Sequence, residues 1–115
     1  MGLSINQIRD NNIRARHLVQ RCKMQHFAVG AFNVDNQETL IAIAKAAKKL
    51  NSPVLVELSK NEVQSMGLEN IRDMVDNYKD EYGIEMFLNL DHSPSVEAAK
   101  KAIDAGYEFI HIDIS

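Results

Sequence analysis

The chain has 115 residues, of which 45% are hydrophobic and 25% charged, a composition typical of a globular domain. Its formal charge is −3, and basic and acidic residues are mixed along it, which excludes the basic stripe of a nucleic-acid or anionic-membrane partner. The lone Cys22 excludes an internal disulfide, and no apolar stretch approaches the ~20 residues of a membrane helix. We therefore expect one cytoplasmic domain. A complete eight-stranded α/β barrel takes about 250 residues, so this length excludes one.

The leading segment, residues 1–26, is predicted to form a helix. Ser4 is followed three residues later by Gln7, which is a capping-box pattern. Residues 27–34 are apolar and predict a first strand, after which Asp35-Asn36 can cap a helix that ends before Pro53. The later elements follow in chain order: strand 54–58, a linker-like stretch around 61–67, helix 68–82, strand 86–90, helix 95–105 and strand 109–114.

Residues 27–115 are thus expected to form four parallel strands with three crossover helices, because strands that alternate with amphipathic helices require a parallel sheet. The strands alternate between an aliphatic and a polar face, whereas the strands of a doubly wound sheet are nearly continuous apolar runs. A barrel explains this pattern, since its aliphatic face meets the helices and its polar face lines the interior. The predicted fold class is an α/β (TIM) barrel, of which this chain holds the first four βα-type units.

Polar residues follow every predicted strand at its carboxyl end, where parallel α/β folds gather their chemistry. Asp91 and His92 are the most informative pair, as a general base beside a metal ligand or as a turn in which Asp91 only caps a helix. Asp113 fits a metal ligand, an acid/base or a partner of His111, and His111 is interpreted as a hydrogen-bonded core histidine. The other polar strand ends are Asn33 and Ser59.

Three strings carry a family resemblance: AVGAFNVDNQETL, NSPVLVELS and LNLDHSPSVEAAKKAIDAGYEFIHIDIS. In this order and spacing they resemble the amino-terminal half of the class II fructose-bisphosphate aldolases and the similar tagatose-bisphosphate enzymes. The resemblance covers residues 27–115, and its most specific part is LDHS followed by KKAIDAGY and IDIS. It implies a zinc-dependent barrel enzyme that reversibly cleaves a phosphorylated ketose into dihydroxyacetone phosphate and an aldehyde.

The resemblance also implies roles for single residues. Asp91 corresponds to the catalytic acid/base, His92 to a ligand of the catalytic zinc, and Asp113 to a ligand of a second divalent or monovalent cation. Asn33 and Ser59 match substrate-binding residues, with Ser59 at a phosphate. The family's other zinc ligands belong to the later half of the barrel, so the isolated chain is expected to be inactive and the full-length form to be a homo-oligomer.

Two readings of other classes stay open. A single-domain α/β binding or phosphoacceptor module has a similar length and places an Asp after its third strand. A half-barrel without enzymatic activity could instead self-associate, because exposed strand edges invite pairing.

Overall fold

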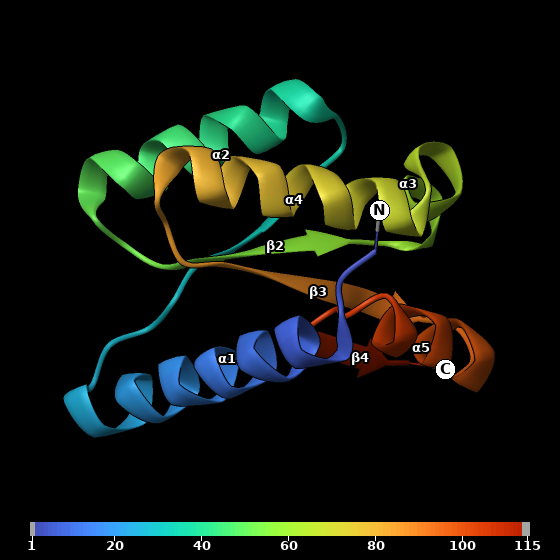
Figure 1. Ribbon diagram of the computed structural model, residues 1–115, viewed down its shortest axis with the longest axis horizontal. Coiled ribbons are helices and arrows are strands. Elements are labelled where there is room, and N and C mark those ends of the chain that lie inside the picture. Colours follow the sequence, from blue (N-terminus) through green and yellow to red (C-terminus); the bar gives the residue numbers. More distant parts are fainter. Residues whose placement is uncertain (1, 114–115) are drawn as a thin grey trace.

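The computed structural model describes residues 2–113 as a four-stranded parallel sheet between helices (Figure 1). The strands lie in the order β1-β2-β3-β4, as consecutive units of a barrel do, whereas doubly wound phosphoacceptor domains reverse direction after the first strand. The elements are α1 (Ile5–Gln25), β1 (Ala31–Asn33), α2 (Gln37–Leu50), β2 (Val54–Leu58), α3 (Lys60–Met66), α4 (Leu68–Tyr82), β3 (Met86–Ser93), α5 (Val96–Asp104) and β4 (Phe109–Ile112).

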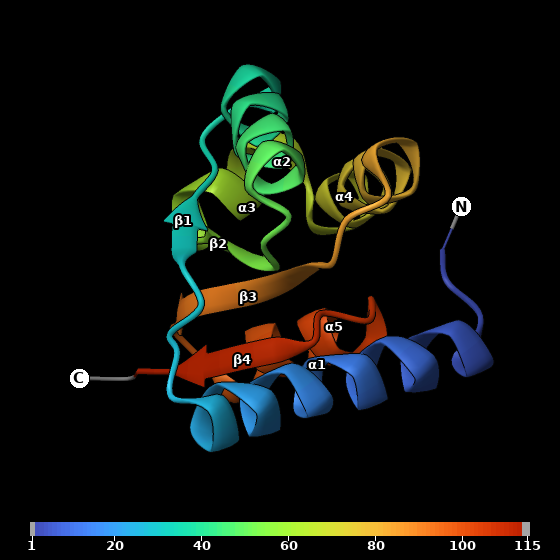
Figure 2. The same ribbon diagram turned by 90° about the vertical axis from the view of Figure 1, so that its left-hand side faces the viewer.

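Helices cover the two faces of the sheet in different ways. Figure 2 shows α2 and α4 on one side of the strands and α1 on the other. On the first side, Val56 and Leu88 are fully buried in the main core, together with Leu40 of α2 and Val75 of α4. This is the aliphatic strand face that the alternation predicts.

The opposite face is divided along the length of the strands. Near the amino ends, Phe87 packs against Ala15 and Leu18 of α1, with Leu55 and Phe109 partly buried beside it. Towards the carboxyl ends, the side chains of this face become polar. Helix α1 therefore covers the apolar half and leaves the polar half accessible.

The polar caps predicted for three helices are present. Ser4 and Gln7 form the full capping box, with hydrogen bonds of 3.1 and 2.8 Å. Asn36 accepts a hydrogen bond from the Thr39 amide at 2.8 Å, and Ser95 accepts one from the Ala98 amide at 3.1 Å. These side chains bind amide groups that have no partner inside the helix, which fixes where each helix begins.

Four predicted elements have different bounds. The first strand covers only Ala31–Asn33, because β1 is an edge strand that pairs with β2 alone. The stretch around 61–67, predicted to be a linker, belongs largely to helix α3 (Lys60–Met66). Strand β3 runs to Ser93, and β4 is described to Ile112, so the predicted strand position at 114 lies outside the described residues.

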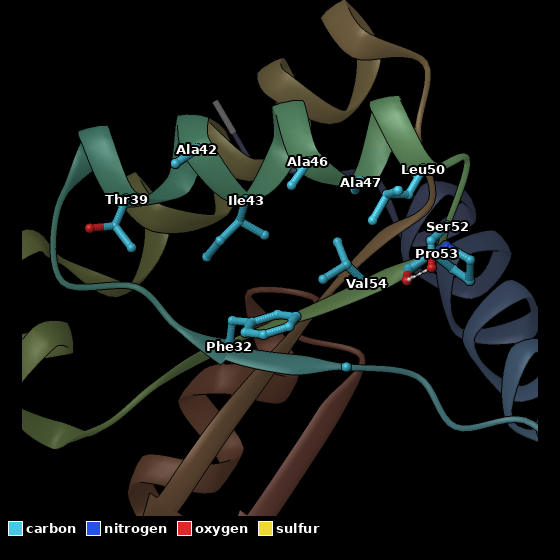
Figure 3. A pocket seen from close by; sticks show the side chains of 11 residues that line it. Phe32, Thr39, Ala42, Ile43, Ala46, Ala47, Leu50, Ser52, Pro53 and Val54 are labelled. Carbon is cyan, nitrogen blue, oxygen red and sulfur yellow. Dashed lines mark hydrogen bonds between the residues drawn. The ribbon is translucent and has the colours of Figure 1, made fainter.

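An apolar pocket of about 390 Å³ lies between α2 and the edge strand β1 (Figure 3). Phe32, Ile43 and Val54 are among its lining residues. Phe32 pairs in register with Val56 of the aliphatic face, so this pocket lies on the helix-covered side of the sheet and is separate from the polar face. None of the helices within residues 2–113 has the length and apolar character needed to cross a membrane.

A buried ion pair joins α4 to the start of β4. The Arg72 guanidinium donates to Glu108 Oε2 at 2.9 Å and to Asp76 at 2.5 and 3.2 Å, and its side chain is only 1% exposed. Glu108 Oε2 also accepts a hydrogen bond from the Leu88 amide of β3 at 2.9 Å. Burial alone would lower the pKa of Arg72, but Glu108 and Asp76 outweigh it and raise that pKa. The Arg72 guanidinium therefore stays charged, and the hydrogen bonds of Arg72 and Glu108 hold two strands and a helix together.

Replacing Arg72 by Met is expected to lower the free energy of unfolding by about 3–5 kcal/mol, because Glu108 would be left as a buried charge without its partner. Urea unfolding followed by circular dichroism measures this loss. Arg14→Met is the matched control, since Arg14 pairs with Asp10 at the same helical spacing but is 60% exposed, and it should cost less than ~1 kcal/mol. Equal losses in the two variants would contradict the prediction.

Candidate active site

The carboxyl ends of β3 and β4 carry a backbone irregularity that builds the site. Leu90 pairs with Ile110, and the next pairing joins Ser93 to Ile112. Between these pairs, β3 has two residues, Asp91 and His92, where β4 has only His111. This arrangement is a β-bulge, a feature that occurs often beside active sites because it redirects side chains.

His92 accommodates the bulge by adopting a left-handed backbone conformation, with φ 50°. In a regular strand, Asp91 and His92 would point to opposite faces of the sheet. The bulge instead brings both side chains next to His111. A left-handed backbone costs a non-glycine residue about 1–2 kcal/mol, and such strain is concentrated at functional sites.

Asp91, His92 and His111 form one compact cluster. Asp91 Oδ1 lies 3.2 Å from His111 Nδ1, and Asp91 Oδ2 lies 3.6 Å from His92 Nε2. The two imidazole rings have centroids 4.9 Å apart. One possible ligand atom from each residue lies within 4.8 Å of the others. Imidazole nitrogen and carboxylate oxygen are donors that zinc accepts, so these residues fit the predicted metal chemistry.

Asp113 binds the other side of His92. Its Oδ2 lies 3.0 Å from His92 Nδ1, while Nε2 of the same ring faces Asp91. The hydrogen bond with Asp113, followed by the charge of Asp91, raises the pKa of His92 above its ordinary value. Asp113 was predicted to be a metal ligand; in this structure it contacts His92, and its ligand role stays a prediction.

His111 differs from its interpretation as a core histidine. Its side chain is 50% exposed, and its hydrogen-bonding partner is the acid/base candidate Asp91. The reason is that α1 covers only the amino-terminal half of this face, so His111 lies beyond the covered region. The signal was present in the sequence, because strand alternation already placed His111 on the same face as Asp113.

The two predicted substrate residues lie at the carboxyl ends of β1 and β2. Asn33 pairs in register with Glu57, and Glu57 accepts a hydrogen bond from Asn89 of β3 at 3.0 Å. Asn33, Glu57 and Asn89 therefore form a polar row across the same face. Of these three residues, only Asn33 is predicted from the sequence to contact substrate.

Ser59 follows β2 directly and is half-buried. Its hydroxyl donates a hydrogen bond to Glu62, which lowers the pKa of Glu62. Asn33 at the end of β1 and Ser59 after β2 thus lie at the carboxyl ends of neighbouring strands, and neither is a member of the Asp91–His92–His111 cluster.

Comparison with known proteins agrees with this geometry. The family described as "Fructose-bisphosphate aldolase class-II" matches residues 13–115. The chain belongs to this family. A 6-phospho-5-dehydro-2-deoxy-D-gluconate aldolase from Bacillus velezensis is 36% identical over 104 residues, which are 88% of this chain and 36% of that protein. A fructose-bisphosphate aldolase from Helicobacter pylori is 32% identical over 90% of this chain and 34% of that protein.

A solved structure supports the fold assignment. The YdjI aldolase from Escherichia coli K12 superimposes with a TM-score of 0.77 and 25% identity, over 88% of this chain and 39% of that chain. The prediction of part of a class II aldolase barrel is confirmed. The chain spans about a third of the length of the two curated relatives, so the remainder of their barrels has no counterpart among its residues.

The pKa of His92 can be tested by following its ring protons by NMR. We expect a midpoint above the ordinary ~6.5 of histidine, because protonated His92 is stabilised by Asp113 and Asp91. This stabilisation of the fold is complete below the ordinary pKa and is lost as the pH rises through the raised one. Asp113→Asn should lower the midpoint and Asp10→Asn should leave it unchanged. A midpoint unaffected by Asp113→Asn would show that the hydrogen bond is not the cause.

Proposed function

We propose that this chain carries the acid/base and one metal ligand of a class II aldolase. The reaction is the reversible cleavage of a phosphorylated ketose into dihydroxyacetone phosphate and an aldehyde. The observation that carries the proposal is the cluster of Asp91 with two histidines at the carboxyl edge of the sheet, in a chain of this family. Parallel α/β barrels place their catalytic residues at this edge.

Asp91 is suited to proton transfer at the substrate. Its side chain is 25% exposed, and contacts from His111 and His92 on its two oxygens fix its orientation. A carboxylate held in this way can accept the proton of the C4 hydroxyl during cleavage and return it in the reverse reaction. His111 then acts as a positioning residue for Asp91.

His92 is suited to hold the zinc ion through Nε2, since its Nδ1 is engaged by Asp113. Zinc held there would supply Lewis acidity, polarising the ketose carbonyl and stabilising the negative charge that carbon–carbon cleavage leaves behind. The hydrogen bond with Asp113 fixes the ring orientation and tautomer, as second partners of metal-bound histidines do. The second cation at Asp113, implied by the family resemblance, is a further part of this proposal.

Asn33 and Ser59 are proposed to contact the substrate from β1 and β2, with Ser59 at a phosphate group. The two relatives act, by their names, on fructose bisphosphate and on 6-phospho-5-dehydro-2-deoxy-D-gluconate, so both compounds are candidate substrates. Because the chain spans about a third of these proteins, we propose that cleavage requires a complete barrel and that residues 1–115 alone are inactive. The complete protein is proposed to be a cytoplasmic homo-oligomer of carbohydrate metabolism, as the family resemblance implies.

A chimera tests this function. Residues 1–115 replace the matching part of the Helicobacter pylori aldolase, and triose phosphate release from fructose 1,6-bisphosphate is measured with zinc present. The same exchange in the Bacillus velezensis aldolase tests the second substrate. We expect activity in at least one chimera, and we expect Asp91→Asn to lower its kcat by roughly 10²–10⁴-fold because the proton acceptor is lost.

Asp10→Asn serves as the control, since Asp10 lies in an exposed ion pair of α1. It should leave the kcat of the chimera unchanged. A folded, zinc-loaded chimera whose kcat is the same with Asp91 and with Asn at that position would contradict the assignment of Asp91.

A further inference from the structure

We propose that the apolar pocket beside β1 is a docking surface for one strand and one helix of another polypeptide. The strand pairs with the free edge of β1, and the amphipathic helix that follows this strand packs against α2 in the pocket. The partner with this chemistry is the portion of a class II aldolase barrel that has no counterpart among residues 1–115, and it binds without a covalent link. This inference concerns assembly and needs no aldol activity.

Strand β1 has a free edge that can accept another strand. Within residues 2–113, β1 pairs with β2 alone, and Ala31, Phe32 and Asn33 are all exposed. A free edge presents unpaired N–H and C=O groups, and stable proteins commonly protect it with charged residues, proline or a covering element. Residues 30–33 include neither a charged residue nor a proline. This composition favours a strand that is paired on both sides.

The pocket beside this edge exposes apolar side chains to water. Figure 3 shows Phe32, Ile43 and Val54 directed into the space between α2 and the strands, and the volume of the pocket is about 390 Å³. Phe32 is 52% exposed and Leu50, at the end of α2, is 73% exposed. The charged side chains of α2 do not line the pocket. A contiguous apolar surface beside charged residues is typical of an interaction site.

The positions of the other helices identify what fills the pocket. Helix α2 follows β1 and lies beside α4, which follows β2, on the aliphatic side of the sheet (Figure 2). Right-handed crossovers repeat this arrangement from one βα unit to the next. The pocket lies between α2 and β1, on the flank of α2 that faces away from α4. A helix that follows a strand paired with the free edge of β1 would occupy this position.

A second copy of this chain does not supply such a helix. The free edge of its β4 could pair with β1, but no helix follows β4 within residues 2–113. Two copies would therefore pair their strands and leave the pocket open. The chain covers 34% of the Helicobacter pylori aldolase, and the rest of such a barrel consists of further strands, each followed by a helix. These units fit both the strand edge and the pocket.

Binding between two separate polypeptides tests the proposal. The 115-residue chain is produced together with an affinity-tagged fragment, which is the part of the Helicobacter pylori aldolase outside the matched region. We expect the two to be recovered together and to sediment as a 1:1 complex in analytical ultracentrifugation. Ala46→Glu should weaken binding roughly 100-fold, because Ala46 is an exposed lining residue and the docked helix would bury an unpaired carboxylate.

Lys45→Glu is the matched control, because Lys45 is exposed on α2 and does not line the pocket. It introduces the same carboxylate at the neighbouring residue and should leave binding unchanged. Because both positions are exposed in the chain alone, both variants are expected to fold, and circular dichroism checks this.

A second measurement needs no separate fragment. In the chimera with the Helicobacter pylori aldolase, the docking strand and helix are part of the same polypeptide. Ala46→Glu should therefore lower the urea midpoint of the chimera, whereas it should leave the midpoint of the 115-residue chain unchanged. Lys45→Glu should leave both midpoints unchanged.

Three results would overturn the proposal. The first is the absence of a complex between the folded chain and the soluble fragment. The second is an effect of Ala46→Glu no larger than that of Lys45→Glu on binding and on the midpoint of the chimera. The third is self-association of the 115-residue chain that Ala46→Glu abolishes, which would make a second copy the occupant.

Failure of the proposed aldolase function gives a different result. In that case the complex forms and depends on Ala46, which supports the docking surface, while neither the complex nor the chimeras release product from either substrate.

Discussion

Strand β3 has one residue more than β4 over the stretch where the two strands pair, and this mismatch has a fixed position. On the amino-terminal side of the mismatch, the Glu108 carboxylate accepts hydrogen bonds from the Leu88 amide of β3 and from the buried Arg72. On the carboxyl-terminal side, the Asp113 amide donates a hydrogen bond to the Ser93 carbonyl at 3.1 Å, so the strands are joined again. The extra residue must therefore be absorbed between these two anchors, where Asp91 and His92 face His111. The chemistry of the site depends on this register.

The architecture follows from the sequence because each of its signals is local. Strict alternation in residues 54–58 and 86–90 identified the aliphatic face, and the capping side chains Ser4, Asn36 and Ser95 marked where three helices begin. The errors concern elements whose extent is set by neighbours. The first strand is short because it has one partner strand, and helix α3 forms where polar residues resembled a linker. Such extents depend on tertiary pairing, which local patterns do not contain.

The candidate site was predictable to the level of residue types at strand ends, but not to the level of their contacts. Asp91, His92 and Asp113 were identified from their positions after apolar runs and from the family resemblance. Alternation placed His111 on the inner face, but it assumes a regular strand and could not show that a bulge brings Asp91 and His92 next to this residue. The bulge and the limited coverage by α1 are both tertiary features. Because of these two features, His111 is an exposed neighbour of Asp91 and not a core histidine.

The left-handed backbone of His92 has a consequence for the choice of substitutions at this position. Glycine adopts a positive φ without the steric cost that a Cβ imposes, and asparagine tolerates it better than most residues. His92→Gly would thus remove the imidazole and relieve the local strain in the same step, whereas His92→Ala would keep the strain and lose the contacts that offset it. A glycine variant therefore changes two quantities at once: it removes the side chain that the site uses, and it removes the steric cost of the left-handed backbone. At His92, the backbone conformation lowers stability while the imidazole ring that it positions belongs to the site.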